Sequence, residues 1–231
     1  MGNRTVLALC LGLLASCGRI DFDPLGAPAD AGRTVSFGET GTATFGGVTA
    51  DAYVESANPT FNNGATAQIY SSGLAANLQV GLLRFDVAAL PPGTHVLSGE
   101  LHLHVGNNAA DTGTATLYRL LEPWTEGTAK GAAGVANWNE RAAATAWAAP
   151  GAGQPGSRDT ISLGSFQPAA TLTSYVVPLT SEGVATVYGW IAAASTNAGF
   201  AIVSDGDDWK FDSHEGPTPA DRPELVLVVD P

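Results

Sequence analysis

The strongest constraint on the fold is a series of short segments in which apolar and polar residues alternate. In residues 100–105, Leu101, Leu103 and Val105 alternate with polar residues, and side chains two positions apart lie on the same face of a β-strand. Comparable segments, bounded by turn residues, occupy 52–55, 67–70, 78–87, 96–105, 114–121, 160–163, 172–179, 200–203 and 225–229. This spacing predicts an all-β protein built as a single β-sandwich, jelly-roll-like in topology.

Two stretches depart from the strand pattern. Val184, Val187 and Ile191 recur with helical spacing, which predicts one short helix near residues 181–195, capped by Thr180 or Ser181. Residues 122–158 are rich in Gly, Ala, Asn and Trp and show no periodicity. We expect a long irregular loop there, and ordered loops of that length are commonly functional.

The N-terminus has the features of a bacterial lipoprotein leader. A basic residue, Arg4, precedes an apolar run at 6–15, which is too short to span a bilayer. The run ends in Leu-Ala-Ser-Cys17, which resembles a lipobox, where diacylglycerol is added to the cysteine and the chain is cut before it. We therefore expect a signal peptide at 1–16, a lipidated Cys17 with a flexible tether at 17–49, and a folded domain at 50–231. An ordinary secretory signal is the alternative. Short strands at 34–37 and 42–45 are the alternative for the end of the tether, which would then join the domain before residue 49.

The leader and the composition limit the partners. We expect an exported protein, on the outer membrane or cell surface, facing either the periplasm or the exterior, that touches the membrane through its lipid alone. The remaining cysteine, Cys10, also lies in the leader, so no disulfide is expected in the domain. With 10 basic against 22 acidic residues the net charge is −12, which argues against nucleic acid as a partner.

The irregular stretch at 122–158 concentrates residues suited to binding sugars. An indole face packs against the apolar face of a pyranose, and neighbouring amide, carboxylate and guanidinium groups can bond to hydroxyls. The candidate carbohydrate-binding residues are Trp124, Glu126, Trp138, Asn139, Arg141 and Trp147. Burial in a hydrophobic core is the alternative for these tryptophans.

Two polar groups suggest metal binding. Five carboxylates lie close in sequence and could hold a structural calcium ion, the one cofactor we consider: Asp205, Asp207, Asp208, Asp212 and Glu215. A solvated turn is the alternative. On the predicted strand at 96–105, His102, His104 and Glu100 share one face, a geometry that suits a metal ion but also an ordinary exposed strand face.

The order of several local motifs resembles the DNRLRE domain, also classed as carbohydrate-binding module family 96. The motifs are Asp51-Ala-Tyr-Val, Asn58-Pro, Asn62-Asn-Gly, Leu82-Leu-Arg-Phe-Asp, Leu90-Pro, Leu101-His-Leu, Pro123-Trp-Thr-Glu, Asn137-Trp-Asn, Asn197-Ala-Gly-Phe, Phe211-Asp-Ser-His-Glu and Asp221-Arg-Pro-Glu-Leu. The resemblance implies a carbohydrate-binding β-sandwich. Its F-x-S-x-E motif often has Arg where this chain has His214, and the scarcity of basic residues argues against acidic polysaccharides as ligands.

These observations predict a non-catalytic module that binds a polysaccharide or other glycan and is presented on a lipid anchor. The sequence contains no G-x-S-x-G or H-E-x-x-H motif, which argues against two classes of hydrolase. An envelope structural or adhesion protein that binds other proteins is the main alternative. A lipid-anchored polysaccharide hydrolase is a weaker one, because a carboxylate pair is not identifiable in so acidic a chain.

Overall fold

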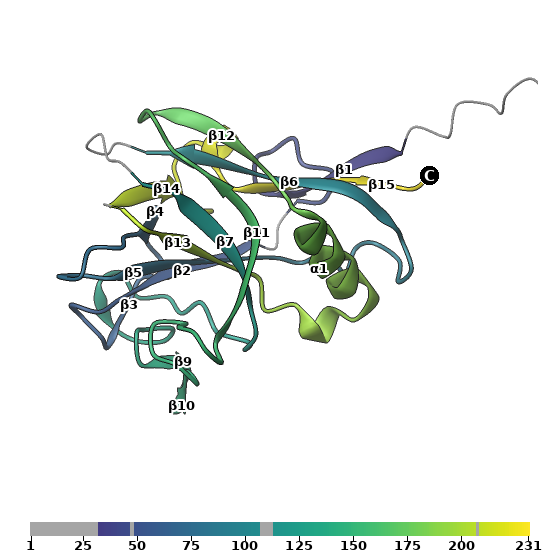
Figure 1. Cartoon of the computed structure of the whole chain (residues 1–231). Helices are drawn as coiled ribbons and strands as arrows, with labels where there is room; N and C mark the ends of the chain where they lie inside the picture. Colours follow the sequence, from purple (N-terminus) through teal and green to yellow (C-terminus); the bar gives the residue numbers. More distant parts are fainter. Residues whose placement is uncertain (1–31, 47–48, 107–112, 207) are drawn as a thin grey trace, which may run out of the picture. The chain divides into compact units, whose positions relative to one another are not determined.

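The computed structural model describes residues 32–46, 49–106, 113–206 and 208–231 (Figure 1). The predicted signal peptide, Cys17, most of the predicted tether and Asp207 lie outside these residues. In the described part, no helix is long and apolar enough to cross a membrane.

The described chain folds into two main antiparallel sheets, as Figure 1 shows. The first sheet has the order β1 (Arg33–Gly38), β15 (Glu224–Val229), β6 (Val96–Val105), β14 (Trp209–Asp212) and β4 (Gln68–Ser71), with β12 (Thr173–Pro178) also paired to β6. The second has the order β11 (Arg158–Phe166), β7 (Ala115–Leu120), β13 (Phe200–Ser204), β5 (Gln79–Phe85) and β2 (Thr49–Glu55). The predicted all-β sandwich is confirmed.

Two short ribbons complete the strand inventory of the described residues. They pair β3 (Phe61–Asn62) with β8 (Ala132–Ala133) and β9 (Glu140–Ala142) with β10 (Thr145–Ala146). Three of these strands lie within the predicted irregular stretch, which is otherwise irregular.

The main core lies between the two sheets. The alternation in β6 places Leu101, Leu103 and Val105 in this core, each no more than 1% exposed. Leu117 of the second sheet belongs to the same core and is fully buried. Each such side chain contributes roughly 1.5–3 kcal/mol by leaving water, and this burial explains why the period-two pattern predicted the strand well.

The helix α1 (Ser181–Ala192) packs against β6 and β11 (Figure 1). Thr180 caps it, because its Oγ1 accepts a hydrogen bond from the Gly183 N–H at 3.1 Å. Trp190 is 2% exposed and packs edge-on against Phe200 with ring centroids 5.0 Å apart. Trp190 therefore widens the apolar face that was predicted from Val184, Val187 and Ile191. The helix ends at Ala192, before the predicted end near residue 195. Two 3₁₀ turns follow later in the chain, η1 (Ala194–Thr196) and η2 (Pro219–Asp221).

The folded unit begins earlier than the expected boundary at residue 50. Strand β1 pairs along its whole length with β15, from Arg33 opposite Val229 to Gly38 opposite Glu224. Phe37 is 1% exposed and stacks on Phe45 at 4.9 Å. Residues 33–38 and Phe45 are therefore part of the packed domain, which agrees with the alternative that short strands join the end of the tether to the domain.

Candidate functional site

The irregular segment between β7 and β11 covers the outer face of the second sheet. There it forms a second hydrophobic core with the sheet side chains that point away from the sandwich interior. The sheet supplies Val54, Val80, Leu82 and Ala201, and the segment supplies Trp124, Ala136, Trp147 and Ala152. Figure 1 shows this segment alongside β2 and β5. We call residues 121–157 the covering segment.

Two of the candidate sugar-binding tryptophans are internal. Trp124 and Trp147 are each 4% exposed. The Trp124 Nε1–H donates to the Ala198 carbonyl, and the Trp147 Nε1–H donates to the Asn137 carbonyl, both at 2.9 Å. This corrects the expectation that they form a sugar-stacking surface, because they anchor the covering segment to the sheet. The sequence cannot distinguish core packing from sugar stacking, since both roles use the apolar face of the indole.

Two of the polar candidates also hold the covering segment in place. Glu126 Oε1 accepts a hydrogen bond from the Asp51 N–H of β2 at 2.6 Å. Arg141 donates to the Pro123 carbonyl at 2.7 Å and lies 3.3 Å from Glu122 Oε1. Asn139 is exposed. The structure therefore does not gather the six candidates on one exposed surface.

Trp138 is the candidate tryptophan that reaches a surface groove. It is partly buried against the second core and lines a groove of about 190 Å³ together with the edge of the sheet. The lining consists of Ser72, Gly73, Leu78, Gln79, Val80, Trp138, Pro150, Gly151, Gly153, Arg158, Val203 and Ser204. We call this the Trp138 groove. Pockets that enclose drug-sized ligands measure roughly 300–1,000 Å³, so this groove suits contact with one face of a ligand.

Gly151 fixes the position of the Trp138 ring. Its N–H donates to the Trp138 carbonyl at 2.7 Å, and a Cβ placed on it would lie 2.5 Å from ring carbons of Trp138. Gly151 also has a φ of +70°, which favours glycine. The indole therefore lies against a backbone that cannot carry a side chain, a role of Gly151 that no sequence motif indicates.

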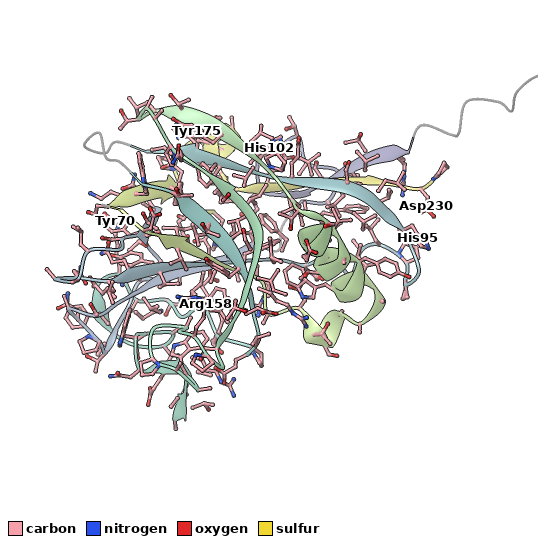
Figure 2. The ribbon with its side chains drawn as sticks, in the orientation of Figure 1. Tyr70, His95, His102, Arg158, Tyr175 and Asp230 are labelled. Carbon is pink, nitrogen blue, oxygen red and sulfur yellow. The ribbon has the colours of Figure 1, made fainter. Side chains whose placement is uncertain are left out.

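Two polar side chains of the groove carry unused hydrogen-bonding capacity. Gln79 is 5% exposed, and within the described protein its Oε1 has no hydrogen-bond partner. The same holds for Nε of Arg158, which begins β11 and is labelled in Figure 2. Arg158 also lies over the Tyr118 ring at 5.7 Å and donates to the Ala152 carbonyl at 2.9 Å. Both unpaired atoms are shielded from solvent, so a ligand in the groove would meet the other atoms of these two side chains.

A larger hollow elsewhere has less of the character of a sugar site. It measures about 350 Å³ and is lined by Thr49, Ala50, Arg84, Asp86, Ala194 and Asn197. It contains no aromatic side chain and is mainly polar. The Trp138 groove is smaller but combines an indole, apolar side chains and a few polar side chains, which is the usual make-up of a ligand site.

A cluster of one histidine and three acidic residues joins the covering segment to the edge of the sandwich. His214 Nδ1 lies 3.1 Å from Asp51 Oδ2 and 3.4 Å from Glu126 Oε1, and its Nε2 lies 3.0 Å from Glu215 Oε1. The backbone N–H of His214 also donates to Asp51 Oδ2 at 2.8 Å. One imidazole thus bridges three carboxylates that come from β2, the covering segment and the β14–β15 connection. We call these four residues the His214 cluster.

The His214 cluster shifts the pKa values of its members. Burial lowers the pKa of His214, but its hydrogen bond to Asp51 and the surrounding carboxylates outweigh this effect and raise the pKa to about 9. Burial raises the pKa of Glu126 to about 7 against the opposing hydrogen bond from the Asp51 N–H. Burial also raises the pKa values of Asp51 and Glu215. The positively charged imidazole is therefore the group that holds the carboxylates together.

The predicted calcium ligands are divided among different partners. Asp205 accepts a hydrogen bond from the Thr114 N–H at 2.6 Å, and Asp208 lies 3.7 Å from the Lys210 ammonium. Asp212 pairs with His104 at 2.6 Å, and Glu215 belongs to the His214 cluster. Strand β14 runs through this stretch. Asp207 lies outside the described residues, and the calcium site stays a prediction.

The geometry defines a two-sheet β-sandwich module with an aromatic groove on a covered outer face. Residues 43–150 match the family model of carbohydrate-binding module family 96. The matched segment is a little under half of the chain; it includes β2 to β10 and Trp138, while Arg158 lies beyond it. No curated protein matches the chain.

Proposed function

We propose that this protein is a non-catalytic carbohydrate-binding module that binds a glycan chain in the Trp138 groove. The observation that carries the proposal is the combination, in the lining of one open groove, of an indole fixed by Gly151 with the polar side chains Gln79 and Arg158. The family match provides the ligand class. Indole faces bind the apolar faces of sugar rings, and the two polar groups can bond to hydroxyls.

The charge of the groove supports binding without catalysis. Glycoside hydrolysis commonly uses two carboxyl groups on either side of the scissile bond. Among the described residues that line the Trp138 groove there is no Asp or Glu, and Arg158 is the one charged side chain. This lining suits the binding of a ligand better than its hydrolysis.

The binding site is tested with Trp138→Ala in the full-length chain on an array of polysaccharides and oligosaccharides. We expect the wild-type protein to bind at least one glycan and the variant to lose about two- to tenfold in affinity, because stacking on one aromatic ring contributes about 0.5–1.5 kcal/mol. Leu172→Ala, at an apolar side chain that is 68% exposed and outside the groove, is the matched control. Wild-type binding to no glycan, or equal binding by Trp138→Ala, would contradict the proposal.

We further propose that the module is exported and held at the outer membrane or cell surface by lipid on Cys17. The support is the lipobox-like Leu-Ala-Ser-Cys17 that follows the apolar run. In cells fed a radiolabelled fatty acid, the wild-type chain should take up label and sediment with membranes. Cys17→Ser should do neither, whereas Cys10→Ser should behave as wild type. Labelling of Cys17→Ser would refute the anchor.

A further inference from the structure

The outer face of the first sheet carries two histidines over a small cavity. His102 and His104 lie two positions apart on β6, so both point away from the core that buries Leu103. Figure 2 shows His102 and Tyr175 on neighbouring strands, β6 and β12. The cavity measures about 90 Å³, and both histidines line it together with Asp221 and Glu224. It is distinct from the Trp138 groove, with which it shares no lining residue.

His104 is held in the orientation of a metal ligand. Its Nδ1 lies 2.6 Å from Asp212 Oδ2, and its Nε2 lies 4.0 Å from Asp221 Oδ1. When Nδ1–H of a neutral imidazole donates to a carboxylate, Nε2 carries the free lone pair. Metal-binding histidines commonly have such a carboxylate on the opposite nitrogen, because it fixes the ring and increases its basicity.

The separation of Nε2 from Asp221 suits a bridging ion. A direct hydrogen bond does not span 4.0 Å, and two ligands bonded to one tetrahedral zinc ion at about 2.0–2.1 Å lie about 3.3–3.4 Å apart. Asp221 ends the short turn η2 and its side chain is 31% exposed. A small movement of this side chain therefore brings both atoms to coordination distance.

His102, two residues before His104 on β6, also lies between two carboxylates. Its Nε2 lies 2.7 Å from Glu100 Oε1, and its Nδ1 lies 4.0 Å from Glu224 Oε2. Arg222 also lines the cavity, but its Nε donates to the Gly216 carbonyl at 3.0 Å. The carboxylates around the two imidazoles leave the cavity with an excess of negative charge.

We propose that this cavity is a binding site for a divalent transition metal ion, coordinated by His104 Nε2 and the Asp221 carboxylate, with Asp212 as the positioning residue. The potential ligand atoms of these three residues lie within 4.8 Å of one another. Imidazole nitrogen combined with carboxylate oxygen suits zinc, copper or nickel, whereas calcium binds oxygen ligands. Water molecules complete the coordination.

The test is a calorimetric titration of the full-length chain with Zn²⁺, repeated with Co²⁺ to record the visible absorption of the bound ion. We expect one ion per chain, with at least tenfold weaker binding in His104→Gln and in Asp221→Asn. Asp212→Asn should weaken binding by about 10–100-fold, the usual effect of removing an orienting carboxylate. His95→Gln, at an exposed histidine outside the cavity, should bind as wild type.

Two further controls separate this site from others in the chain. Replacing Cys10 and Cys17 by Ser removes the thiols and should leave the binding of Zn²⁺ unchanged. Thermal unfolding in a chelator shows whether each variant is folded. The proposal is overturned if Zn²⁺ does not bind, if His104→Gln and Asp221→Asn both bind normally, or if Glu126→Gln in the His214 cluster abolishes binding instead.

Discussion

The Nδ1 atom of His214 lies 3.1 Å from Oδ2 of Asp51, a residue 163 positions earlier in the chain. Asp51 is 1% exposed, so the imidazole provides a nearby positive charge for a carboxylate removed from water. Glu126 and Glu215 contact the same ring. The contact therefore ties β2, the covering segment and the β14–β15 connection together through one titratable cation.

The stability of the fold should fall as the pH rises through the titration of His214. The folded pKa of about 9 lies above the ordinary value of 6.5, so its contribution is fully present below about pH 6.5 and is lost by about pH 9. His214→Arg keeps the positive charge and should remove most of this loss, of order 1–3 kcal/mol. Urea unfolding across this range measures it. His95→Arg should retain the wild-type pH dependence, and an unchanged profile in His214→Arg would contradict the assignment.

Titration of Glu126 should lower the stability of the fold over a separate, lower pH range. Its folded pKa of about 7 lies above the ordinary 4.5, so the folded state retains a proton that the unfolded chain has released, and stability falls between about pH 4.5 and 7. Glu126→Gln keeps a hydrogen-bond acceptor for the Asp51 N–H and should flatten this part of the urea profile. Glu140→Gln, outside the His214 cluster, is the control. A profile that keeps its full slope in Glu126→Gln would show that another group titrates.

A methyl group on Gly151 should displace the Trp138 ring. The added Cβ would lie 2.5 Å from the indole at a φ of +70°, and strain of this kind costs of order 1–3 kcal/mol. We expect Gly151→Ala to lower the unfolding free energy and to weaken glycan binding together. Gly41→Ala has a positive φ but no neighbour within 4 Å of the added Cβ, so it controls for backbone strain alone. Glycan binding by Gly151→Ala at wild-type strength would show that the indole position is unimportant.

Removing the cap of α1 should weaken the fold moderately. Thr180 Oγ1 accepts from the Gly183 N–H and also donates to the Ser162 carbonyl at 3.1 Å. Loss of an N-cap costs about 0.5–2 kcal/mol, so Thr180→Ala should lower the unfolding free energy by about that amount. Thr180→Ser retains the hydroxyl and should restore most of it. Equal stability of the Ala and Ser variants would contradict the capping role.

The sequence predicted the parts of this protein that depend on local pattern. The alternation in β6 is read directly from Leu101 and Leu103, because the two faces of a strand meet different surroundings. The helix and its cap at Thr180 follow from periodicity and from the hydrogen-bonding needs of a first turn. The carbohydrate-binding class also followed from the order of short motifs, which the family match supports.

Tertiary structure decided which of these side chains face a ligand. Trp124, Trp138 and Trp147 are chemically equivalent in the sequence, and the fold of the covering segment over the second sheet buries two of them and leaves the third at a groove. Pairings such as His214 with Asp51 depend on strands brought together over 163 residues. Local composition determines which residues can form a strand, a cap or a sugar contact, but burial and charge pairing depend on neighbours that are distant in the chain, and the fold alone provides them.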